Sequence, residues 1–459
     1  MLMAGVQPTV VTFNTMLDCY CKEGQPEEAY KILAEMESSS EKASSYSYNP
    51  LIHALFSKGF VEQALWFEND MVRRGVVLSV VTYNTMIHWL CKIGHVDHAR
   101  QKFDEMERKQ LVRDVLSYNS LMYGYCRTGK VKEALLLFED LRNARIVPTA
   151  ITFNILIDGH CRLGAIEMAQ KLKEDMVKFG CKPDIYTYTI LVNGSCKIGN
   201  LPMAKEYFDE MLHKGLQPDS FAYSTRIAGE LELGTIAQAF QLREEMIERD
   251  VSPDLITYNI LIDGICKKGN LDEAYQLWQK MISDGFSPDC ITCTCIIHAL
   301  CDKGRLEHAK KVFDRMWSYS VIPSVVTYTI LIHAYARKGN IESAYKLFFE
   351  MLEKDVQPNE ITYNALINGL CRTGNIILAY KHFYEMQEKG LFPNKYTYTL
   401  LISANCTLGR WNEAFRLYGE MLQKGVDPDS CTHSILFKQM DDDSRNLSIS
   451  YLENYVLVG

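Results

Sequence analysis

The chain has 459 residues, 47% of them hydrophobic and 23% charged, a length that suits about three ordinary globular domains. This composition excludes disordered, collagen-like and mucin-like chains. The formal net charge of −8 is not that of a globally basic nucleic-acid-binding protein, and no apolar run reaches the ~18–20 residues of a membrane span. The first residues match neither a signal peptide nor an Arg- and Ser-rich transit peptide. The 15 cysteines are open to three interpretations, as disulfides, metal ligands or core residues.

A strict 35-residue period runs through the sequence. Glycine recurs every 35 residues from Gly24 to Gly409, and alanine does the same from Ala29 to Ala414. Twelve units of 35 residues therefore fill residues 10–429 without an insertion or deletion. A period of this length is typical of repeat architectures, in which each unit is one supersecondary element.

The two ends of the chain depart from the period. Residues 1–9, MLMAGVQPT, are similar to the end of a further unit, so we expect the tail of a truncated repeat there. Residues 430–459 begin a thirteenth unit and then pass through DDDSRN into a short apolar tail. We expect a partial repeat and a C-terminal cap in this segment, because terminal repeats need a cover for their apolar faces.

Each unit reads as two helices, as the unit at residues 255–289 illustrates. In its first half, Tyr258, Ile262 and Cys266 recur at i+4 and mark the apolar face of a helix. Gly269 is placed to end that helix in a left-handed conformation. The second half keeps a 3–4 apolar spacing up to a Gly and a Pro. A single hairpin cannot bury its apolar faces alone, so we expect an all-α fold, an α-α superhelix (solenoid) of about twelve 35-residue helix-turn-helix repeats.

The consensus of the units carries a family resemblance. It reads V-T-Y-N-x-L-I-x-G-x-C-K-x-G…A…F-x-E-M…G-x-x-P-D and strongly resembles the pentatricopeptide repeat of plant organellar RNA-binding proteins over residues 10–429. The uniform units are similar to P-class arrays, not to those that alternate long and short units. Tetratricopeptide repeats have about 34 residues and a W-x₂-L-G-x₂-Y motif, which disagrees with this sequence. The resemblance implies that one repeat faces one base of single-stranded RNA.

The fifth residue of every unit is small and able to form hydrogen bonds. A surface selected only for solubility would use Lys, Glu and Gln freely, so this restriction indicates a chemical role. The alternative is local hydrogen bonding near a helix start. By the resemblance these residues read bases, and they are Asn14, Asn49, Asn84, Asn119, Asn154, Thr189, Ser224, Asn259, Thr294, Thr329, Asn364 and Thr399.

The last residue of each unit is the second candidate base reader. All twelve are good N-caps for the helix that follows, so we expect a structural role together with base reading. They are Ser44, Ser79, Asp114, Thr149, Asp184, Asp219, Asp254, Asp289, Ser324, Asn359, Asn394 and Asp429.

The second residue of each unit is bulky and apolar throughout. It lies three residues before the fifth and so shares its helix face. In the family such residues sandwich the base, and plain packing is the alternative. They are Val11, Tyr46, Val81, Leu116, Ile151, Tyr186, Phe221, Ile256, Ile291, Val326, Ile361 and Tyr396.

The thirteenth residue is basic in eight units and is the candidate phosphate contact. Two acidic residues at the same place, Glu232 and Asp302, leave a net +6 along this row. The slope of the logarithm of the binding constant against the logarithm of the salt concentration (the salt slope) is ~−0.7 per neutralised phosphate, so we expect a salt slope of roughly −4 to −6. The basic residues are Lys22, Lys92, Arg127, Arg162, Lys197, Lys267, Arg337 and Arg372. An acidic row is expected on the second helices, at Glu35, Asp70, Glu105, Asp140, Asp175, Glu210, Glu245, Glu350, Glu385 and Glu420.

Most cysteines belong to one apolar row of the first helix and are interpreted as small core residues. They are Cys21, Cys91, Cys126, Cys161, Cys196, Cys266, Cys301, Cys371 and Cys406. Cys290 and Cys293 have CxxC spacing but lack a second CxxC or paired histidines nearby, which disfavours a zinc or redox site. We expect reduced thiols, no metal and no cofactor.

These patterns favour a sequence-specific single-stranded RNA-binding protein that reads one base per repeat. By the resemblance, Asn with Asp favours U, Thr or Ser with Asp favours G, Thr with Asn suggests A and Asn with Asn suggests C. Pairs that end in Ser or Thr are ambiguous. The expected target is about 12 nucleotides with the sequence 5′-YYUYUGGURACG-3′, read from the N- to the C-terminus.

The resemblance also implies a setting and a role. By the resemblance, such a protein works in a mitochondrion or chloroplast and acts in transcript processing, stabilisation or translation. The resemblance also allows other RNA-processing proteins as partners. No membrane or small-molecule partner is expected. The alternative is an α-solenoid scaffold for protein–protein interactions, for which the restricted fifth residue has no explanation. An enzyme is not expected, because no deaminase signature H-x-E with C-x-x-C follows the array.

Overall fold

The computed structural model describes residues 8–39 and 41–438, and within these ranges it contains α-helices and no strand. The chain divides into two compact units, Met1–Val251 and Ser252–Gly459. Most of the expected N-terminal tail, residues 1–7, and of the expected C-terminal cap, residues 439–459, lies outside the described residues. Among the described helices, none has the length and apolar character needed to span a membrane.

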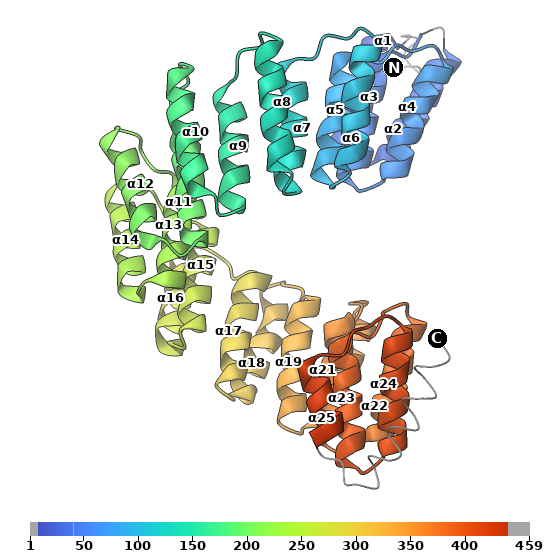
Figure 1. The fold of residues 1–459 in the computed structure, drawn as a ribbon, viewed down its shortest axis with the longest axis vertical. Coiled ribbons are helices and arrows are strands. Elements are labelled where there is room, and N and C mark those ends of the chain that lie inside the picture. Colours follow the sequence, from blue (N-terminus) through green and yellow to red (C-terminus); the bar gives the residue numbers. More distant parts are fainter. Residues whose placement is uncertain (1–7, 40, 439–459) are drawn as a thin grey trace. The chain divides into compact units, whose positions relative to one another are not determined.

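The first unit consists of paired helices in chain order (Figure 1). They are α1 (Val10–Lys22), α2 (Pro26–Ser38), α3 (Ser45–Ser57), α4 (Val61–Arg73), α5 (Val80–Lys92), α6 (Val96–Arg108), α7 (Val115–Arg127), α8 (Val131–Asn143), α9 (Ala150–Arg162), α10 (Ile166–Lys178), α11 (Ile185–Lys197), α12 (Leu201–His213), α13 (Ser220–Leu233) and α14 (Ile236–Glu248).

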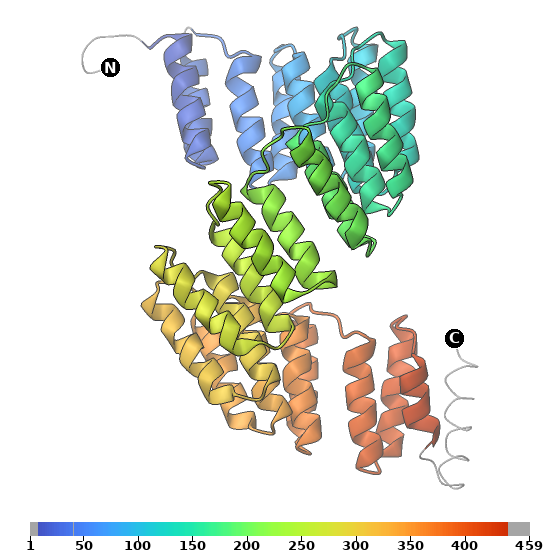
Figure 2. The same cartoon turned by 90° about the vertical axis from the view of Figure 1, so that its left-hand side faces the viewer.

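The second unit repeats the same pairing (Figure 2). Its helices are α15 (Leu255–Lys267), α16 (Leu271–Ser283), α17 (Cys290–Asp302), α18 (Leu306–Ser318), α19 (Val325–Arg337), α20 (Ile341–Glu353), α21 (Glu360–Arg372), α22 (Ile376–Glu388), α23 (Lys395–Thr407), α24 (Trp411–Gln423) and α25 (Ser430–Lys438). The expected all-α architecture of tandem helix pairs is confirmed.

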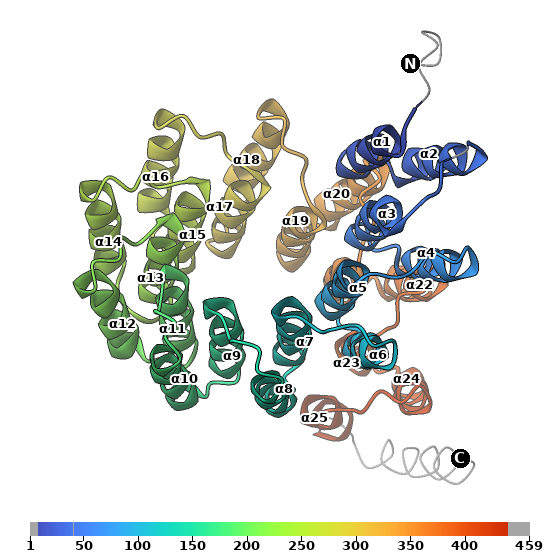
Figure 3. The ribbon, with the colours of Figure 1, turned by 90° about the horizontal axis from the view of Figure 1, so that it is seen from above.

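Each unit has two layers of helices. The first helix of a repeat packs on the first helices of its neighbours, as α5 does on α3 and α7, and also on its own second helix. Seen from above in Figure 3, α1, α3, α5, α7 and α9 follow one another in one row, with α2, α4, α6 and α8 in a second row beside it. One layer therefore consists of first helices, whose outer surfaces carry the candidate site.

Side-chain caps start the first helices. The Asp184 carboxylate accepts the backbone N–H of Thr187 at 2.8 Å, and Asp289 accepts that of Thr292 at the same distance. Such a cap satisfies one of the N–H groups that a helix start leaves unpaired. The N-cap role expected for the last residue of each unit is confirmed in these repeats.

Glycine ends the first helices, with one exception. Gly269 has φ +82°, as expected for a left-handed C-terminus. Gly234 has φ −109°, and α13 runs one residue further than the other first helices and ends at Leu233. The repeat at residues 220–254 therefore has an irregular turn.

Close helix packing explains the cysteine row. An ideal Cβ built on Gly159 would lie 2.5 Å from the Cys126 sulfur, and one on Gly194 would lie 2.6 Å from that of Cys161. The twelfth residue of one repeat therefore packs against the backbone of the tenth residue of the next. Burial raises the pKa of the Cys126 thiol to about 12. Seven of the nine cysteines in this row are buried, while Cys21 and Cys371 are half-buried, which supports the core interpretation.

The repeat at residues 220–254 also carries charge in its core. Arg226 and Glu230 form an ion pair at 2.5 Å, and both side chains are about 95% buried. The other repeats place mainly aliphatic residues at the position of Arg226. A buried pair of this kind contributes little to stability, because desolvation offsets the attraction.

Candidate nucleic-acid interface

The second residues of all twelve repeats are exposed apolar side chains. Their exposed fractions run from 50% for Tyr396 to 78% for Tyr46. The tyrosines two positions later, Tyr83 and Tyr188 among them, are fully buried on the opposite side of the same helices. This exposure disfavours the packing alternative for the second residue. A repeated row of exposed apolar groups is typical of a binding surface.

The fifth residues lie deeper on the same face. Seven of them are buried, for example Asn84, Asn154 and Ser224 at 5%, 4% and 2% exposure, and the other five are half-buried. Most Asn side chains at this position accept a hydrogen bond from the following repeat. For example, Thr187 donates its hydroxyl proton to Asn154 Oδ1 at 2.7 Å. The alternative of structural hydrogen bonding thus has a real basis, although the bond joins two repeats and is not local.

The structure brings the two candidate base readers together in the Asn/Asp repeats. Asn84 Nδ2 donates to the two oxygens of Asp114 at 3.0 and 3.1 Å. The equivalent distances are 2.9 Å in the pair of Asn259 with Asp289 and 3.4 Å in the pair of Asn154 with Asp184. In these repeats an amide donor and a carboxylate acceptor therefore sit side by side.

The Thr repeats arrange this position differently. Thr329 donates its hydroxyl proton to the Val325 carbonyl oxygen at 2.7 Å and lies 2.7 Å from the Thr362 hydroxyl. Thr189 likewise donates to the Ile185 carbonyl at 2.7 Å. The proton is used within the helix, so the hydroxyl oxygen is left mainly as an acceptor.

The eight basic thirteenth residues are all exposed, each at the last position of its first helix. A cation there also interacts favourably with the helix C-terminus, which is a structural role that the sequence reasoning missed. Three of the eight pair with an aspartate at the ninth residue. These ion pairs are Lys22–Asp18 at 2.6 Å, Arg162–Asp158 at 2.6 Å and Lys267–Asp263 at 2.7 Å.

The three aspartates reduce the charge of the basic row. Counting them lowers the net charge of the ninth and thirteenth residues together from +6 to +3. They occupy the same place in their 35-residue units, so the sequence alone could have shown that acidic residues accompany the basic row. Exposed ion pairs are weak and exchange readily with other anions.

Two grooves on this face combine the residue classes. One of about 460 Å³ is lined by Thr329, Asn364, Ile361, Tyr396 and Arg337, among others. A second, of about 310 Å³ in the other unit, has Leu116, Asn119, Ile151, Asn154 and Tyr186 in its lining. Each groove therefore has a polar floor between apolar side chains of successive repeats.

Histidines at the ninth residue complete both grooves and were missed by sequence reasoning. His298 and His333 line the larger groove, and His88 lines the smaller one. Burial lowers the pKa of His88, and the neighbouring Lys92 lowers it further. The pKa of His333 is also lowered, first by burial and then by Arg337. The imidazoles of His88 and His333 are therefore uncharged near neutral pH.

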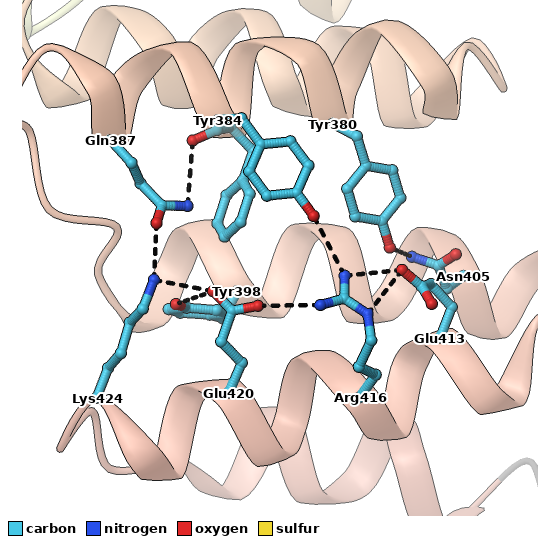
Figure 4. A network of polar contacts seen from close by, with 10 residues as sticks. Tyr380, Tyr384, Gln387, Tyr398, Asn405, Glu413, Arg416, Glu420 and Lys424 are labelled. Atoms are coloured by element: carbon cyan, nitrogen blue, oxygen red, sulfur yellow. Dashed lines mark hydrogen bonds and ion pairs between the residues drawn. The ribbon is translucent and has the colours of Figure 1, made fainter.

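The acidic row has a structural role that the sequence did not reveal. Most of the buried tyrosine hydroxyls donate to it, at 2.9 Å from Tyr83 to Glu105 and 2.8 Å from Tyr188 to Glu210. Figure 4 shows one example, in which Glu420 accepts from Tyr398 and pairs with Arg416 and Lys424. These carboxylates therefore link the two helix layers.

Cys290 and Cys293 lie at the start of α17. Cys293 is fully buried in the place that a tyrosine holds in most repeats, and burial raises its pKa to about 12. In the described part of the chain, no three His, Cys, Asp or Glu side chains gather as a metal site would require.

Family models match most of the chain. Models described as the PPR repeat family and the PPR repeat match residues 8–56, 46–76, 74–107, 113–162, 148–197, 186–216, 221–267, 253–302, 288–337, 323–372, 358–407 and 400–440. The chain belongs to the pentatricopeptide repeat family. No curated protein matches the sequence.

Solved structures of similar fold include other repeat proteins. The crystal structure of maize PPR10 is 22% identical, with 98% of this chain and 79% of that chain covered and a TM-score of 0.49. PPR10 in complex with an 18-nt psaJ RNA element is 22% identical, with 100% and 81% covered and a TM-score of 0.42. Yeast Rmd9p in complex with a 16-nt target RNA is 11% identical, with 96% of each chain covered and a TM-score of 0.46.

Proposed function

We propose that this pentatricopeptide repeat chain binds single-stranded RNA and recognises its sequence one base per repeat. The observation that carries the proposal is the pairing of exposed apolar second residues with deeper, hydrogen-bonding fifth residues in all twelve repeats. Apolar and aromatic side chains stack on bases of any identity, whereas hydrogen bonds to base edges discriminate among them. A protein-binding scaffold would account for the apolar row, and the bonds between repeats would account for part of the polar floor, but neither accounts for the Asp partners of the Asn side chains.

The proposed target is 5′-YYUYUGGURACG-3′, with the pairs at the fifth and last residues as readers and the basic thirteenth residues as phosphate contacts. The Asn/Asp contacts support the U assignments, because they offer a donor beside an acceptor, as the edge of uracil does. Family membership supports a role in mitochondrial or chloroplast RNA processing, stabilisation or translation. In this role the chain binds RNA and does not catalyse a reaction.

Selection from a random single-stranded RNA pool at two salt concentrations tests the proposal. We expect enrichment of a motif that agrees with the proposed target, above all at its UGGU centre, and a smaller recovery at the higher salt concentration. Recovery without any enriched sequence would overturn the one-base-per-repeat reading. No recovery of RNA at either salt concentration would overturn RNA binding itself.

Changes at the apolar row test where the RNA lies. Tyr186→Ala and Phe221→Ala should each weaken RNA binding by ~1–3 kcal/mol, since each removes one stacking surface. Both side chains are 59% exposed, so the melting temperature should stay nearly unchanged. Phe349→Ala is the matched control, because Phe349 is 55% exposed on a second helix, α20. Equal losses of RNA affinity from all three changes would show that the RNA does not lie along the row of second residues.

A further inference from the structure

A hydrogen bond links the fifth residue of one repeat to the third residue of the next. The third residue is Thr or Ser in eleven of the twelve repeats, and Ala222 is the exception. Its hydroxyl donates to the Oδ1 atom of the preceding fifth-residue asparagine. The distances are 2.7 Å for Ser47–Asn14, 2.8 Å for Thr82–Asn49, 2.6 Å for Ser117–Asn84, 2.7 Å for Thr187–Asn154, 2.5 Å for Thr292–Asn259 and 2.7 Å for Thr397–Asn364.

The direction of this bond follows from the helix cap. The Thr397 hydroxyl oxygen accepts the backbone N–H of Asn394 at 3.2 Å, so its own proton is available for donation. The nearest acceptor is Asn364 Oδ1 at 2.7 Å, compared with 3.2 Å to Asn394 Oδ1. An asparagine amide has an acceptor and a donor end that differ only by a half-turn. With Oδ1 held by Thr397, Nδ2 of Asn364 is the end left to face the groove.

Some repeats hold the amide at both ends. In the Asn84 repeat, Ser117 holds Oδ1 while Asp114 accepts from Nδ2. In the Asn364 repeat the last residue is Asn394, whose amide nitrogen donates to Glu360. The hydroxyl is thus the one described contact that orients the Asn364 amide, whereas an Asn/Asp repeat has two such contacts.

One of the seven asparagine repeats lacks the bond. Asn119 Oδ1 is buried and has no hydrogen-bond partner among the described residues. The Thr152 hydroxyl behind it contacts Thr149 at 3.2 Å and accepts the backbone N–H of Thr149 at 3.1 Å. Within the described ranges, no hydrogen bond therefore fixes the acceptor end of the Asn119 amide.

We propose that, behind each repeat whose fifth residue is asparagine, the Thr or Ser at the third position of the next repeat is a positioning residue for the base which that asparagine reads. Its hydroxyl holds the asparagine amide with Nδ2 toward the RNA, so the repeat offers a donor to the carbonyl oxygens of pyrimidines. A freed amide can turn and offer an acceptor, which also suits donors on purines. The inference rests on the proposed function and extends it, because the specificity of one repeat then depends on a side chain of the next.

The inference predicts an order of the asparagine repeats by the strength of their base preference. The Asn84, Asn154 and Asn259 repeats, held at both ends, should show the strongest base preference. The Asn14, Asn49 and Asn364 repeats, held by the hydroxyl, should be intermediate. The Asn119 repeat should be weakest, so the fourth base of the target should be the most variable pyrimidine position.

Thr397→Val tests the inference, because it removes the hydroxyl while nearly keeping the side-chain shape. The measurement is the relative affinity of the full chain for four 12-nucleotide RNAs that differ at the eleventh base. The preference for a pyrimidine over a purine should fall about 3- to 10-fold, the range expected for one hydrogen bond. Thr397→Ser should keep the preference. Thr187→Val, tested at the fifth base, should show a smaller fall in the pyrimidine preference, because Asp184 still holds the Asn154 amide.

The base preference separates positioning from helix capping. Loss of a cap lowers the melting temperature and the affinity for all four RNAs alike, but it does not change their order. Thr82→Val, behind Asn49, repeats the test at the second base in case Thr397→Val does not fold. A wild-type preference that both valine variants retain would overturn the inference alone. A wild-type chain with no preference at the second, fifth and eleventh bases would overturn the proposed function as well.

Discussion

At the residue scale, each fifth-residue asparagine serves both the fold and the proposed recognition. The Oδ1 atom of Asn259 accepts the Thr292 hydroxyl proton, and its Nδ2 atom donates to Asp289. Asn259 is 9% exposed, so little of it is left for a ligand. Such an arrangement allows a base to be read by a group that the protein already holds in place.

Asn259→Thr should change the preferred eighth base from U to G. Threonine fits this position, because Thr294 and Thr327 form the equivalent contact between hydroxyls at 2.8 Å in the next repeat. The fold should therefore be retained, while the amide donor is replaced by a hydroxyl. Selection from an RNA pool randomised at the eighth base measures the change.

The reverse change is the matched control for this prediction. Thr399→Asn should move the twelfth base from G toward U, because Asp429 then faces an asparagine. An unchanged preference at both bases in correctly folded variants would show that the fifth residue does not read the base.

Several residue roles were predictable, and others were not. The cap role of Asp184 followed from its residue type and its place before a helix. The bond between Thr187 and Asn154 joins residues 33 positions apart, so it depends on how two repeats stack. Its sequence signal, a hydroxyl at the third residue of eleven repeats, was present but had no interpretation without that geometry. Arg226 was visible as a departure from the aliphatic pattern, but its burial with Glu230 was not.

At the element scale, the ends of the second helices store backbone strain. The residue there has a positive φ and is a glycine in six of the described repeats, Gly180 among them. Five other repeats have a non-glycine residue at this place, including Arg145 with φ +56° and Asp250 with φ +60°. A side chain in this conformation costs roughly 1–2 kcal/mol.

Arg145→Gly should stabilise the chain by ~0.5–1 kcal/mol. It removes the left-handed strain, and the greater freedom of glycine in the unfolded chain offsets part of that gain. Thermal or urea unfolding measures the effect. Gly180→Arg should destabilise the chain, since it introduces the strain at the equivalent place. Destabilisation by Arg145→Gly would show that the long side chain makes contacts that outweigh the strain.

The tyrosine–carboxylate links between helix layers predict acid sensitivity. Burial alone would raise the pKa of Glu105, but hydrogen bonds from Lys109 and Tyr83 outweigh it and lower the pKa to about 2. Glu210 behaves in the same way, with hydrogen bonds from Lys173 and Tyr188 and a pKa of about 2. A lowered pKa in the folded state means that these groups stabilise the fold above the unfolded-state pKa and lose this contribution as they are protonated.

The melting temperature should therefore fall as the pH drops from about 4.5 to about 2. Glu105→Gln with Glu210→Gln should lower the melting temperature at pH 7 and make it less dependent on pH in this window. Glu62→Gln, at an exposed carboxylate on α4, is the control and should leave the acid transition in place. An acid transition that is the same in all three chains would assign the sensitivity to other groups.

At the scale of the whole molecule, the charge distribution matters more than the total of −8. The basic thirteenth residues follow the first helices, while the carboxylates of the second helices are used in the fold. The ninth-residue aspartates are the exception, because they lie on the proposed RNA face and pair with three of the eight basic residues. We therefore expect a salt slope shallower than the thirteenth residues alone would give, about −2 to −4.

Replacement of Asp18, Asp158 and Asp263 by Asn should tighten RNA binding by about 3- to 10-fold at low salt, because three basic side chains lose their competing partners. The salt slope should become steeper. Affinity measured across a salt series tests both effects. Weaker binding by the triple variant would mean that these aspartates contact the RNA directly.

The architecture was largely predictable because the period is unbroken. Every unit supplies the same caps, glycines and apolar spacing, and neighbouring units must bury one another's faces. The irregular repeat at residues 220–254 was less predictable, since its longer α13 follows from the turn at Gly234, where the backbone does not adopt the left-handed conformation seen at Gly269.

The central claim is that the order of the repeats reads the order of the bases. The most direct measurement compares the affinity of the chain for 5′-UUUUUGGUAACG-3′ with its affinity for the same bases in reversed order, 5′-GCAAUGGUUUUU-3′. The two RNAs have equal length, charge and composition, so stacking and phosphate contacts alone cannot distinguish them. We predict that the first binds about 10-fold or more tightly, a difference of about 1.4 kcal/mol or more. Equal affinities would contradict the account.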